Sequence, residues 1–204
     1  QLGGIDPYSA SKSCAEIVAN SYRECFFDKN AKGLATARAG NVIGGGDFSA
    51  NRLIPDLIKA IINNHTLQIR NPSATRPWQH VFDVIYGYLL LGKNVYENPS
   101  KFSNAYNFSP TIENCVSVKD IITKINNINE IRYEIIESNL YESSFLSLNS
   151  NKARDELNWK SLYDIDKTLN VAYEWYNCLI DKKNIYNKSI EQYNKYMELI
   201  NEKN

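Results

Sequence analysis

The sequence has no excess of charge of either sign, since Lys and Arg together number 23 and Asp and Glu also number 23. This balance forces no basic face, so we expect no nucleic-acid partner. No apolar run approaches the length that crosses a bilayer. The first residues lack the basic stretch and apolar core of a secretion signal. We therefore expect a cytoplasmic protein without a membrane partner.

Cysteine and histidine are few and scattered. The 4 cysteines form no C-x-x-C pair, and the 2 histidines add no second cluster. Structural metal sites draw their ligands from such pairs, so we expect no metal. The glycine fingerprint G-x-x-G-x-x-G of dinucleotide-binding folds is also absent.

The composition is that of a globular protein, with 43% hydrophobic and 12% aromatic residues. Helical and extended patterns alternate along the chain, which predicts an α/β fold. We expect helices over 7–28, 52–64, from about 81 to 97, 118–126, 151–159 and 166–181. We expect strands over 33–39, 66–71, 104–110, 132–138 and 144–150, and a loop over 40–47. The polar stretch 184–204 is expected to form a helix that lies on the surface.

Two helix starts carry capping signals. Asp6 followed by Pro7 supplies a side-chain cap and then a proline at the first helical position. Ser117 precedes an apolar periodic run and is expected to cap the next helix in the same way. The glycine run Gly44–Gly46 does not open a helix, so we interpret it as a tight turn rather than a phosphate cradle.

Tyr8 and Lys12 form a Tyr-x-x-x-Lys pattern at the start of the first expected helix. Residues four apart lie on one helix face, and an ammonium beside a phenol favours the phenolate. A tyrosine in that setting accepts a proton from a hydroxyl while hydride leaves the same carbon. Most such pairs are merely surface neighbours, so the pattern alone does not decide the function.

The sequence around this pair resembles a known family. DPYSASK, a strand, and then ARAGNVIGGGD are similar to the second half of extended short-chain dehydrogenases/reductases. RLIPD, IRNP and RPWQHV follow in the order and at the spacing of nucleotide-sugar 4,6-dehydratases, with GNVIGGGD and RPWQHV favouring the CDP-glucose type. The resemblance covers roughly Gly3 to Trp175.

The resemblance implies a role for each matching residue. It makes Tyr8 the catalytic base and Lys12 the residue that tunes it, and it implies that both contact NAD together with Val42. It assigns Arg76 to the substrate diphosphate, which suits the bidentate donors of a guanidinium. The further residues that it places against the nucleotide sugar are Asn41, Leu53, Ile54, Ile69 and Asn107. Arg70, in contrast, is interpreted as a solvated charge, and Trp78 and His80 as packing residues.

The resemblance also implies a domain plan. Residues 1–50 would be the last part of an NAD-binding Rossmann domain, with its doubly wound parallel sheet. Residues 51–182 would form mainly a smaller α/β subdomain for the nucleotide sugar, with segments returning to the first domain, and 183–204 a polar helical tail. The glycine fingerprint and the carboxylate that assists loss of water would lie upstream. We therefore expect an exposed apolar face on the first helix, little activity from this chain alone, and a homodimer or higher homo-oligomer at full length.

Three functions stay open from the sequence. The first is NAD-dependent dehydration of CDP-glucose to CDP-4-keto-6-deoxyglucose. The second is a sibling enzyme with the same Tyr and Lys, namely a dTDP-glucose or GDP-mannose dehydratase or a UDP-sugar 4-epimerase. The third is a sugar-nucleotide-binding piece without catalysis, which the missing fingerprint favours and the retained Tyr8 and Lys12 oppose.

Overall fold

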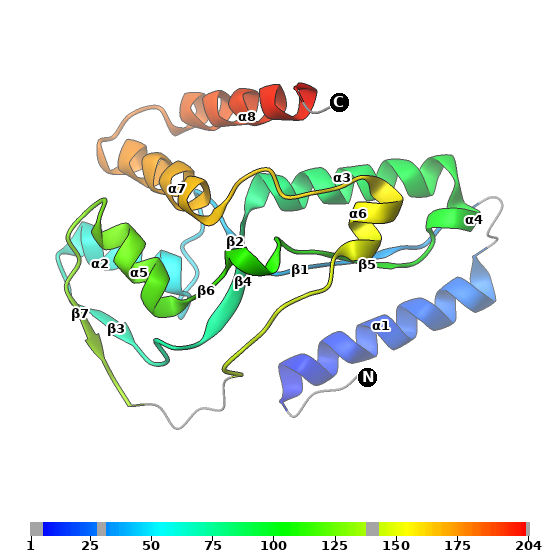
Figure 1. Ribbon diagram of the computed structural model, residues 1–204, viewed down its shortest axis with the longest axis horizontal. Helices are drawn as coiled ribbons and strands as arrows, with labels where there is room; N and C mark the ends of the chain where they lie inside the picture. Colours follow the sequence, from blue (N-terminus) through cyan, green and yellow to red (C-terminus); the bar gives the residue numbers. More distant parts are fainter. Residues whose placement is uncertain (1–5, 28–31, 138–142, 203–204) are drawn as a thin grey trace. The chain divides into compact units, whose positions relative to one another are not determined.

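A computed structural model describes residues 6–27, 32–137 and 143–202 of the chain, which Figure 1 follows in colour. The chain divides into two compact units. The first consists of Gln1–Arg38, Ile85–Phe108 and Ser150–Trp159, and the second of Ala39–Val84, Ser109–Asn149 and Lys160–Asn204. The first change of unit thus falls between Arg38 and Ala39, before residue 50, where the sequence analysis ended the cofactor domain.

The first unit combines helices with a pair of strands. Its elements are α1 (Pro7–Phe26), β1 (Thr36–Ala39), most of α3 (Val81–Glu97), α4 (Pro99–Phe102), β5 (Ala105–Phe108) and α6 (Asn151–Leu157). β1 pairs with β5. Alternation along β5 buries Tyr106 and Phe108 in a core with Trp159, and Gly87 of α3 leaves room for the Phe108 ring.

α1 begins where the sequence predicts. Asp6 lies outside the helix in extended backbone and accepts a hydrogen bond from the backbone N–H of Ser9 at 2.9 Å, with Pro7 at the first helical position. Polar contacts hold α1 on the following segment. Arg23 Nε donates to the carbonyl of Leu34 at 2.9 Å, and Thr36 Oγ1 donates to Glu16 at 2.9 Å.

The second unit contains the remaining elements. They are β2 (Asn41–Ile43), α2 (Leu53–Asn63), β3 (Leu67–Ile69), β4 (Thr75–His80), the 3₁₀ turn η1 (Ile112–Asn114), β6 (Cys115–Ser117), α5 (Val118–Asn126), β7 (Tyr133–Ile135), α7 (Ile165–Ile180) and α8 (Ile185–Asn201). β2 runs parallel to β4, and β6 runs antiparallel to β4 on its other side. β3 and β7 form a separate parallel pair.

The apolar faces of α2, α5 and α7 meet in the core of the second unit. Leu57, Ile121 and Tyr176 are fully buried there, one from each helix. α5 starts with the predicted Ser117 cap, completed by Asp120, whose carboxylate accepts from the Ser117 backbone N–H at 2.9 Å. The mixed α/β class predicted from the alternating patterns is confirmed.

Two local expectations are wrong. The segment 40–47 is not a loop throughout, because Asn41–Ile43 form β2 and pair with Trp78–His80 of β4. Residues 144–150 form no strand; within them only Phe145 makes an isolated bridge, to Thr75. Both errors concern very short extended segments, whose state depends on partners far away in sequence.

The last helix packs more deeply than a surface appendage. α7 and α8 lie side by side (Figure 1), and Gln192 and Tyr196 of α8 are buried. Gln192 Nε2 donates to the carbonyl of Val171 on α7 at 2.8 Å. Although α8 is polar in composition, one of its faces is buried against α7 in the second unit.

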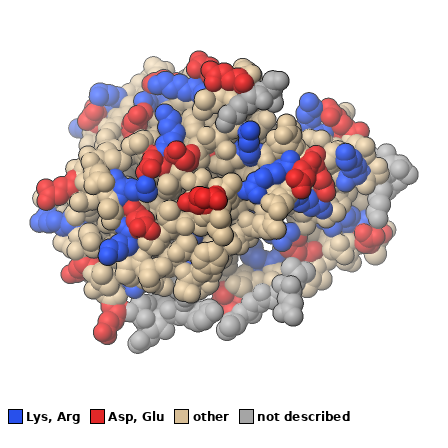
Figure 2. All heavy atoms as spheres, in the orientation of Figure 1, with Lys and Arg blue, Asp and Glu red and all other residues tan. Residues whose placement is uncertain are grey.

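The surface reflects the balanced composition. Figure 2 shows Lys and Arg side chains interspersed with those of Asp and Glu on the face in view. Within the described ranges, no helix combines the length and the apolar character needed to pass through a bilayer.

Candidate functional site

Tyr8 and Lys12 lie one helical turn apart on α1. The Lys12 ammonium nitrogen stands 5.5 Å from the centroid of the Tyr8 ring, over its face. The Tyr8 side chain is 71% exposed, so its hydroxyl is open to a bound molecule. The Asp6–Pro7 start of the helix fixes the first turn, and with it the place of this pair.

Asn107, also in the first unit, lies on β5 between two core residues. Tyr106 and Phe108 point into the core, so alternation places Asn107 on the opposite face of the strand, where it is half-buried. The neighbouring Tyr106 hydroxyl donates to Glu156 at 2.6 Å. Burial and this hydrogen bond to a carboxylate raise the pKa of Tyr106, so it stays a neutral donor.

Asn41 and Arg76 come to one face of the sheet in the second unit. Asn41 pairs with Trp78 across the parallel strands, and Arg76 lies two residues before Trp78 on β4. Since side chains alternate along a strand, Asn41, Trp78 and Arg76 share a face. Arg76 is only 9% exposed, and its Nη1 donates to the carbonyl of Thr75 at 2.9 Å. Val42, on the other face of β2, is 40% exposed.

Leu53 and Ile69 line one small hollow of about 160 Å³ in the second unit. Arg52 and Arg70 also line it, and Arg70 Nη2 donates to Asn51 Oδ1 at 3.0 Å. The hollow therefore combines apolar walls with two guanidinium groups and the carboxylate of Asp56, a lining that suits the donors and acceptors of a heterocyclic base. Arg70, which the sequence analysis set aside as a solvated charge, lines this hollow with two predicted substrate residues.

Ile54 and Ile69 belong mainly to the hydrophobic core. Ile54 is 7% exposed and Ile69 is 3% exposed, and both pack in the apolar cluster of the second unit. Only small exposed edges of the two residues are open to a ligand. The structure thus divides the predicted residues between the units: Tyr8, Lys12 and Asn107 in the first, and Asn41, Val42, Leu53, Ile54, Ile69 and Arg76 in the second.

A buried polar centre lies next to β4, and sequence reasoning missed its main member. Asp83 is fully buried and accepts hydrogen bonds from the backbone N–H of Leu162 at 2.7 Å and from Ser161 Oγ at 2.9 Å. Burial raises the pKa of this carboxyl, although those hydrogen bonds oppose the shift. His80, 2% exposed, accepts from the backbone N–H of Phe82 at 3.2 Å. Burial lowers the pKa of His80 to about 4, so it is neutral at pH 7.

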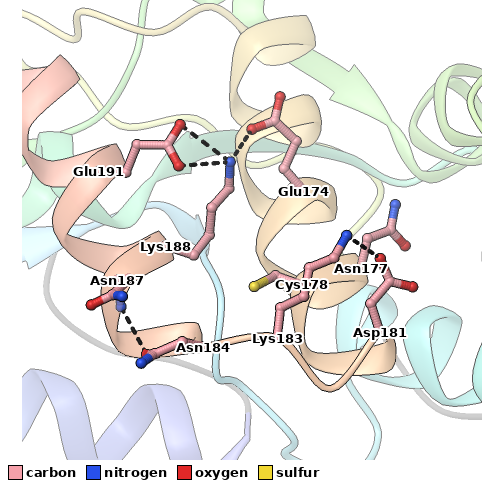
Figure 3. Close-up of a pocket in the computed structure, with 9 residues that line it drawn as sticks. All are labelled: Glu174, Asn177, Cys178, Asp181, Lys183, Asn184, Asn187, Lys188 and Glu191. Atoms are coloured by element: carbon pink, nitrogen blue, oxygen red, sulfur yellow. Dashed lines mark hydrogen bonds and ion pairs between the residues drawn. The ribbon is translucent and has the colours of Figure 1, made fainter.

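A charged hollow of the second unit lies between α7 and α8, away from the predicted residues. It measures about 490 Å³ (Figure 3). Lys188 lies between Glu174 at 3.0 Å and Glu191 at 3.4 Å, and Lys183 pairs with Asp181 at 2.7 Å. The two lysines that line the hollow are thus paired with carboxylates, and the Lys188–Glu174 pair joins α8 to α7. In the described part of the chain, no group of three His, Cys, Asp or Glu side chains is arranged to hold a metal ion.

The fold assigns the chain to a structural class of proteins. Solved structures with similar folds are a UDP-glucuronic acid 4-epimerase from Bacillus cereus in complex with UDP-glucuronic acid and NAD, and a dTDP-glucose 4,6-dehydratase from Bacillus anthracis in complex with NAD. Their TM-scores are 0.74 and 0.72, each at 19% identity over 87% of this chain and 54% of the other. The fold is therefore that of the Rossmann-type epimerases and dehydratases.

The family follows from sequence comparison. A family model described as GDP-mannose 4,6 dehydratase matches residues 1–171, and the chain belongs to that family. A curated CDP-glucose 4,6-dehydratase from Salmonella typhimurium is 36% identical over 96% of this chain and 57% of its own length. A curated dTDP-D-glucose 4,6-dehydratase from Dictyostelium discoideum is 29% identical over 62% of this chain and 27% of its own length. The resemblance to nucleotide-sugar dehydratases is thus confirmed, and the chain spans little more than half the length of the first of these relatives.

Proposed function

We propose that the protein carrying this chain is an NAD-dependent dehydratase that converts CDP-glucose to CDP-4-keto-6-deoxyglucose. The observation that carries the proposal is the 36% identity to the Salmonella CDP-glucose 4,6-dehydratase over 96% of this chain. The dTDP-glucose relative is less similar and matches only 62% of the chain, so we favour cytosine over thymine as the base of the substrate.

Tyr8 is the proposed base of the reaction. Its exposed phenolic oxygen accepts the proton of the sugar C4 hydroxyl as that carbon is oxidised to a ketone. Lys12, one turn away with its ammonium over the Tyr8 ring, offers hydrogen-bond donors to the ribose hydroxyls of the cofactor. Bound NAD would supply the redox chemistry, since hydride taken from C4 would be returned at C6 and no external oxidant would be consumed.

This pair fits the ribose end of a nicotinamide cofactor. An open phenol and an open ammonium on one helix face form a donor and acceptor set for two neighbouring hydroxyl groups. Val42, which belongs to the second unit and is 40% exposed, is the further residue proposed to contact the cofactor. The ketone that Tyr8 helps to form acidifies the proton at C5, and water then leaves across C5 and C6.

Residues of the second unit are proposed to hold the substrate, and Asn107 of the first unit is proposed as a further polar contact to it. Arg76 offers its guanidinium to the diphosphate, and Asn41, on the same face of the sheet, offers an amide to the sugar or its phosphate. Leu53 and the edge of Ile69 border the hollow proposed for the nucleotide. Ile54 contributes through its backbone because its side chain lies in the core.

The test is a search for loss of one water from the substrate. The full-length protein that carries this sequence is incubated with NAD and with CDP-glucose, dTDP-glucose, UDP-glucose or GDP-mannose, and the products are weighed by mass spectrometry. Loss of water from CDP-glucose supports the proposal. Loss of water from another sugar alone corrects the base, and no loss from any sugar overturns the dehydratase assignment.

A pair of variants tests the role of Tyr8. Tyr8→Phe removes the acid–base group and is expected to lower kcat by about 10²- to 10⁴-fold. Tyr22→Phe makes the same change on the same helix at another exposed position, and it should leave kcat unchanged. Equal activity of the two variants would remove Tyr8 from the mechanism.

A further inference from the structure

The loop Gly44–Asp47 directly follows β2, the strand that carries Asn41 and Val42. Gly46 adopts a φ of +86°, a backbone conformation that residues with a β-carbon rarely adopt. A run of glycines gives this segment little stiffness of its own. Something outside the loop must therefore hold it if the end of β2 is to stay in place.

The Tyr176 hydroxyl of α7 joins both ends of this loop. It accepts a hydrogen bond from the backbone N–H of Asp47 at 3.1 Å. Its own proton faces the carbonyl of Asp47 at 2.8 Å and that of Gly44 at 3.1 Å. Tyr176 is fully buried, and burial raises the pKa of the phenol, so the hydroxyl keeps the proton that these carbonyls require. With backbone groups on every side, this hydroxyl has no place for a substrate.

Trp175, the residue before Tyr176, packs against the glycines of the loop. Its indole ring lies against Gly45 so closely that a β-carbon at this position would overlap the ring. The Trp175 and Tyr176 rings stand edge to face, with their centroids 5.4 Å apart. The two neighbouring aromatic residues of α7 therefore act on the same four-residue loop, one by hydrogen bonds and one by shape.

α8 supports Trp175 from the other side. Trp175 Nε1 donates to Ser189 Oγ at 2.9 Å, and the hydroxyl of Ser189 donates to the carbonyl of Ile185 at 2.8 Å. Lys188 and Glu174, the sequence neighbours of Ser189 and Trp175, form an ion pair of 3.0 Å between the same two helices (Figure 3). The polar last helix thus fixes the indole, and the indole covers the loop.

We propose that Tyr176 and Trp175 are positioning residues for the substrate site, because they clamp the loop Gly44–Asp47 and so fix the end of β2, the strand that carries Asn41 and Val42. The proposal rests on the proposed function for the roles of Asn41 and Val42. The clamp itself rests on contacts within the second unit alone. Neither aromatic residue touches the reacting atoms, so loss of the clamp should weaken substrate binding and leave the chemical step intact.

The test compares two losses of a buried hydroxyl in the full-length protein. Tyr176→Phe removes the hydroxyl that holds the loop, and Tyr196→Phe removes a buried hydroxyl of α8 that bonds Asp83 instead. For Tyr176→Phe we expect the amide hydrogen of Asp47 to exchange about tenfold faster, and KM for the nucleotide sugar to rise about tenfold at nearly constant kcat. Tyr196→Phe should leave KM as in the unchanged protein, and its lower stability should speed exchange at Asp47 no more than at other buried amides of the second unit.

A size exchange provides a second arm. Gly45→Ala places a methyl group in the space of the indole and should raise KM in the same way. Adding Trp175→Leu to Gly45→Ala frees that space and should recover part of the lost affinity. A double variant no better than the single one would remove Trp175 from the clamp.

The outcomes separate the clamp from the proposed function. The clamp is overturned if exchange at Asp47 in Tyr176→Phe is no faster, relative to other buried amides of the second unit, than it is in Tyr196→Phe. The exchange measurement needs no turnover, so it decides on the clamp even when the unchanged protein removes water from no nucleotide sugar. If the unchanged protein removes water from no nucleotide sugar, the proposed function is overturned, and with it the role of the clamp in substrate binding. Faster exchange with an unchanged KM overturns the positioning role.

Discussion

The Tyr196 hydroxyl on α8 donates a hydrogen bond of 2.7 Å to the carboxylate of Asp83, which lies 113 positions earlier in the sequence. Both side chains are buried, and the same carboxylate binds the Leu162 backbone and the Ser161 hydroxyl. Asp83 thus joins the start of α3, the segment before α7 and the last helix. A carboxylate in this position is acceptable only because donors surround it.

Loss of the Tyr196 hydroxyl should destabilise the second unit. Tyr196→Phe leaves the buried Asp83 with one donor fewer, and we expect a loss of about 1 to 3 kcal/mol in the free energy of unfolding. Tyr193→Phe is the matched control, because Tyr193 lies on the same helix and is 47% exposed. Urea denaturation of the two variants measures the difference. Equal midpoints would mean that the contact with Asp83 contributes nothing to stability.

Local signals explain what could be predicted from the sequence. The Asp6–Pro7 start of α1 and the Ser117 cap of α5 each depend on residues within one turn, so they can be predicted without knowledge of the fold. The pairing of Tyr8 with Lys12 is equally local. The resemblance to dehydratases drew on short motifs of the same kind, and the family comparison confirms it.

Features that depend on long-range contacts could not be predicted from the sequence. β2 has three residues and exists through its pairing with β4, which no local pattern reports. The hydrogen bond from Tyr176 to Gly44 spans 132 positions, and that from Tyr196 to Asp83 spans 113. The buried face of α8 carries Gln192 as well as Tyr196, so its composition resembles that of a solvated helix.

His80 should make the protein less stable on acidification. Its folded pKa of about 4 lies below the ordinary value of 6.5, so the unfolded chain binds a proton more readily. Stability from this group is complete above pH 6.5 and is lost as the pH falls toward 4, by roughly 3 kcal/mol. Asp83, whose pKa is raised, contributes in the opposite direction over part of this range.

A variant isolates the contribution of His80. His80→Asn keeps an acceptor for the Phe82 backbone N–H but does not titrate. Unfolding free energies at several pH values between 4.5 and 7 should therefore fall less steeply with acid in His80→Asn than in the unchanged protein. Parallel curves would show that His80 does not titrate between those limits, whatever the absolute stability of the variant.

The exposed apolar face of α1 should make this 204-residue chain associate when it is produced alone. Ile17, Val18, Tyr22 and Phe26 are each more than half exposed, and they recur at helical spacing. Light scattering after size-exclusion chromatography should give a mass above 23.4 kDa. The double variant Val18→Lys, Tyr22→Lys should shift the mass toward the monomer. Tyr186→Lys, at an exposed tyrosine of α8, should not. A compact monomer with cooperative unfolding would contradict the expectation.

Arg76 should bind the diphosphate of the nucleotide sugar through the shape of its guanidinium as well as its charge. Arg76→Lys keeps the charge but loses the paired donors, so we expect CDP to bind about tenfold more weakly or worse. Arg132→Lys is the control, since Arg132 bonds Asn64 on the surface and lies outside the hollow lined by Leu53 and Ile69. Titration calorimetry with CDP and with cytidine separates the causes. A phosphate contact predicts a loss for CDP and little change for cytidine, whereas equal losses for both ligands would mean that Arg76 supports the fold of β4 and does not bind the diphosphate.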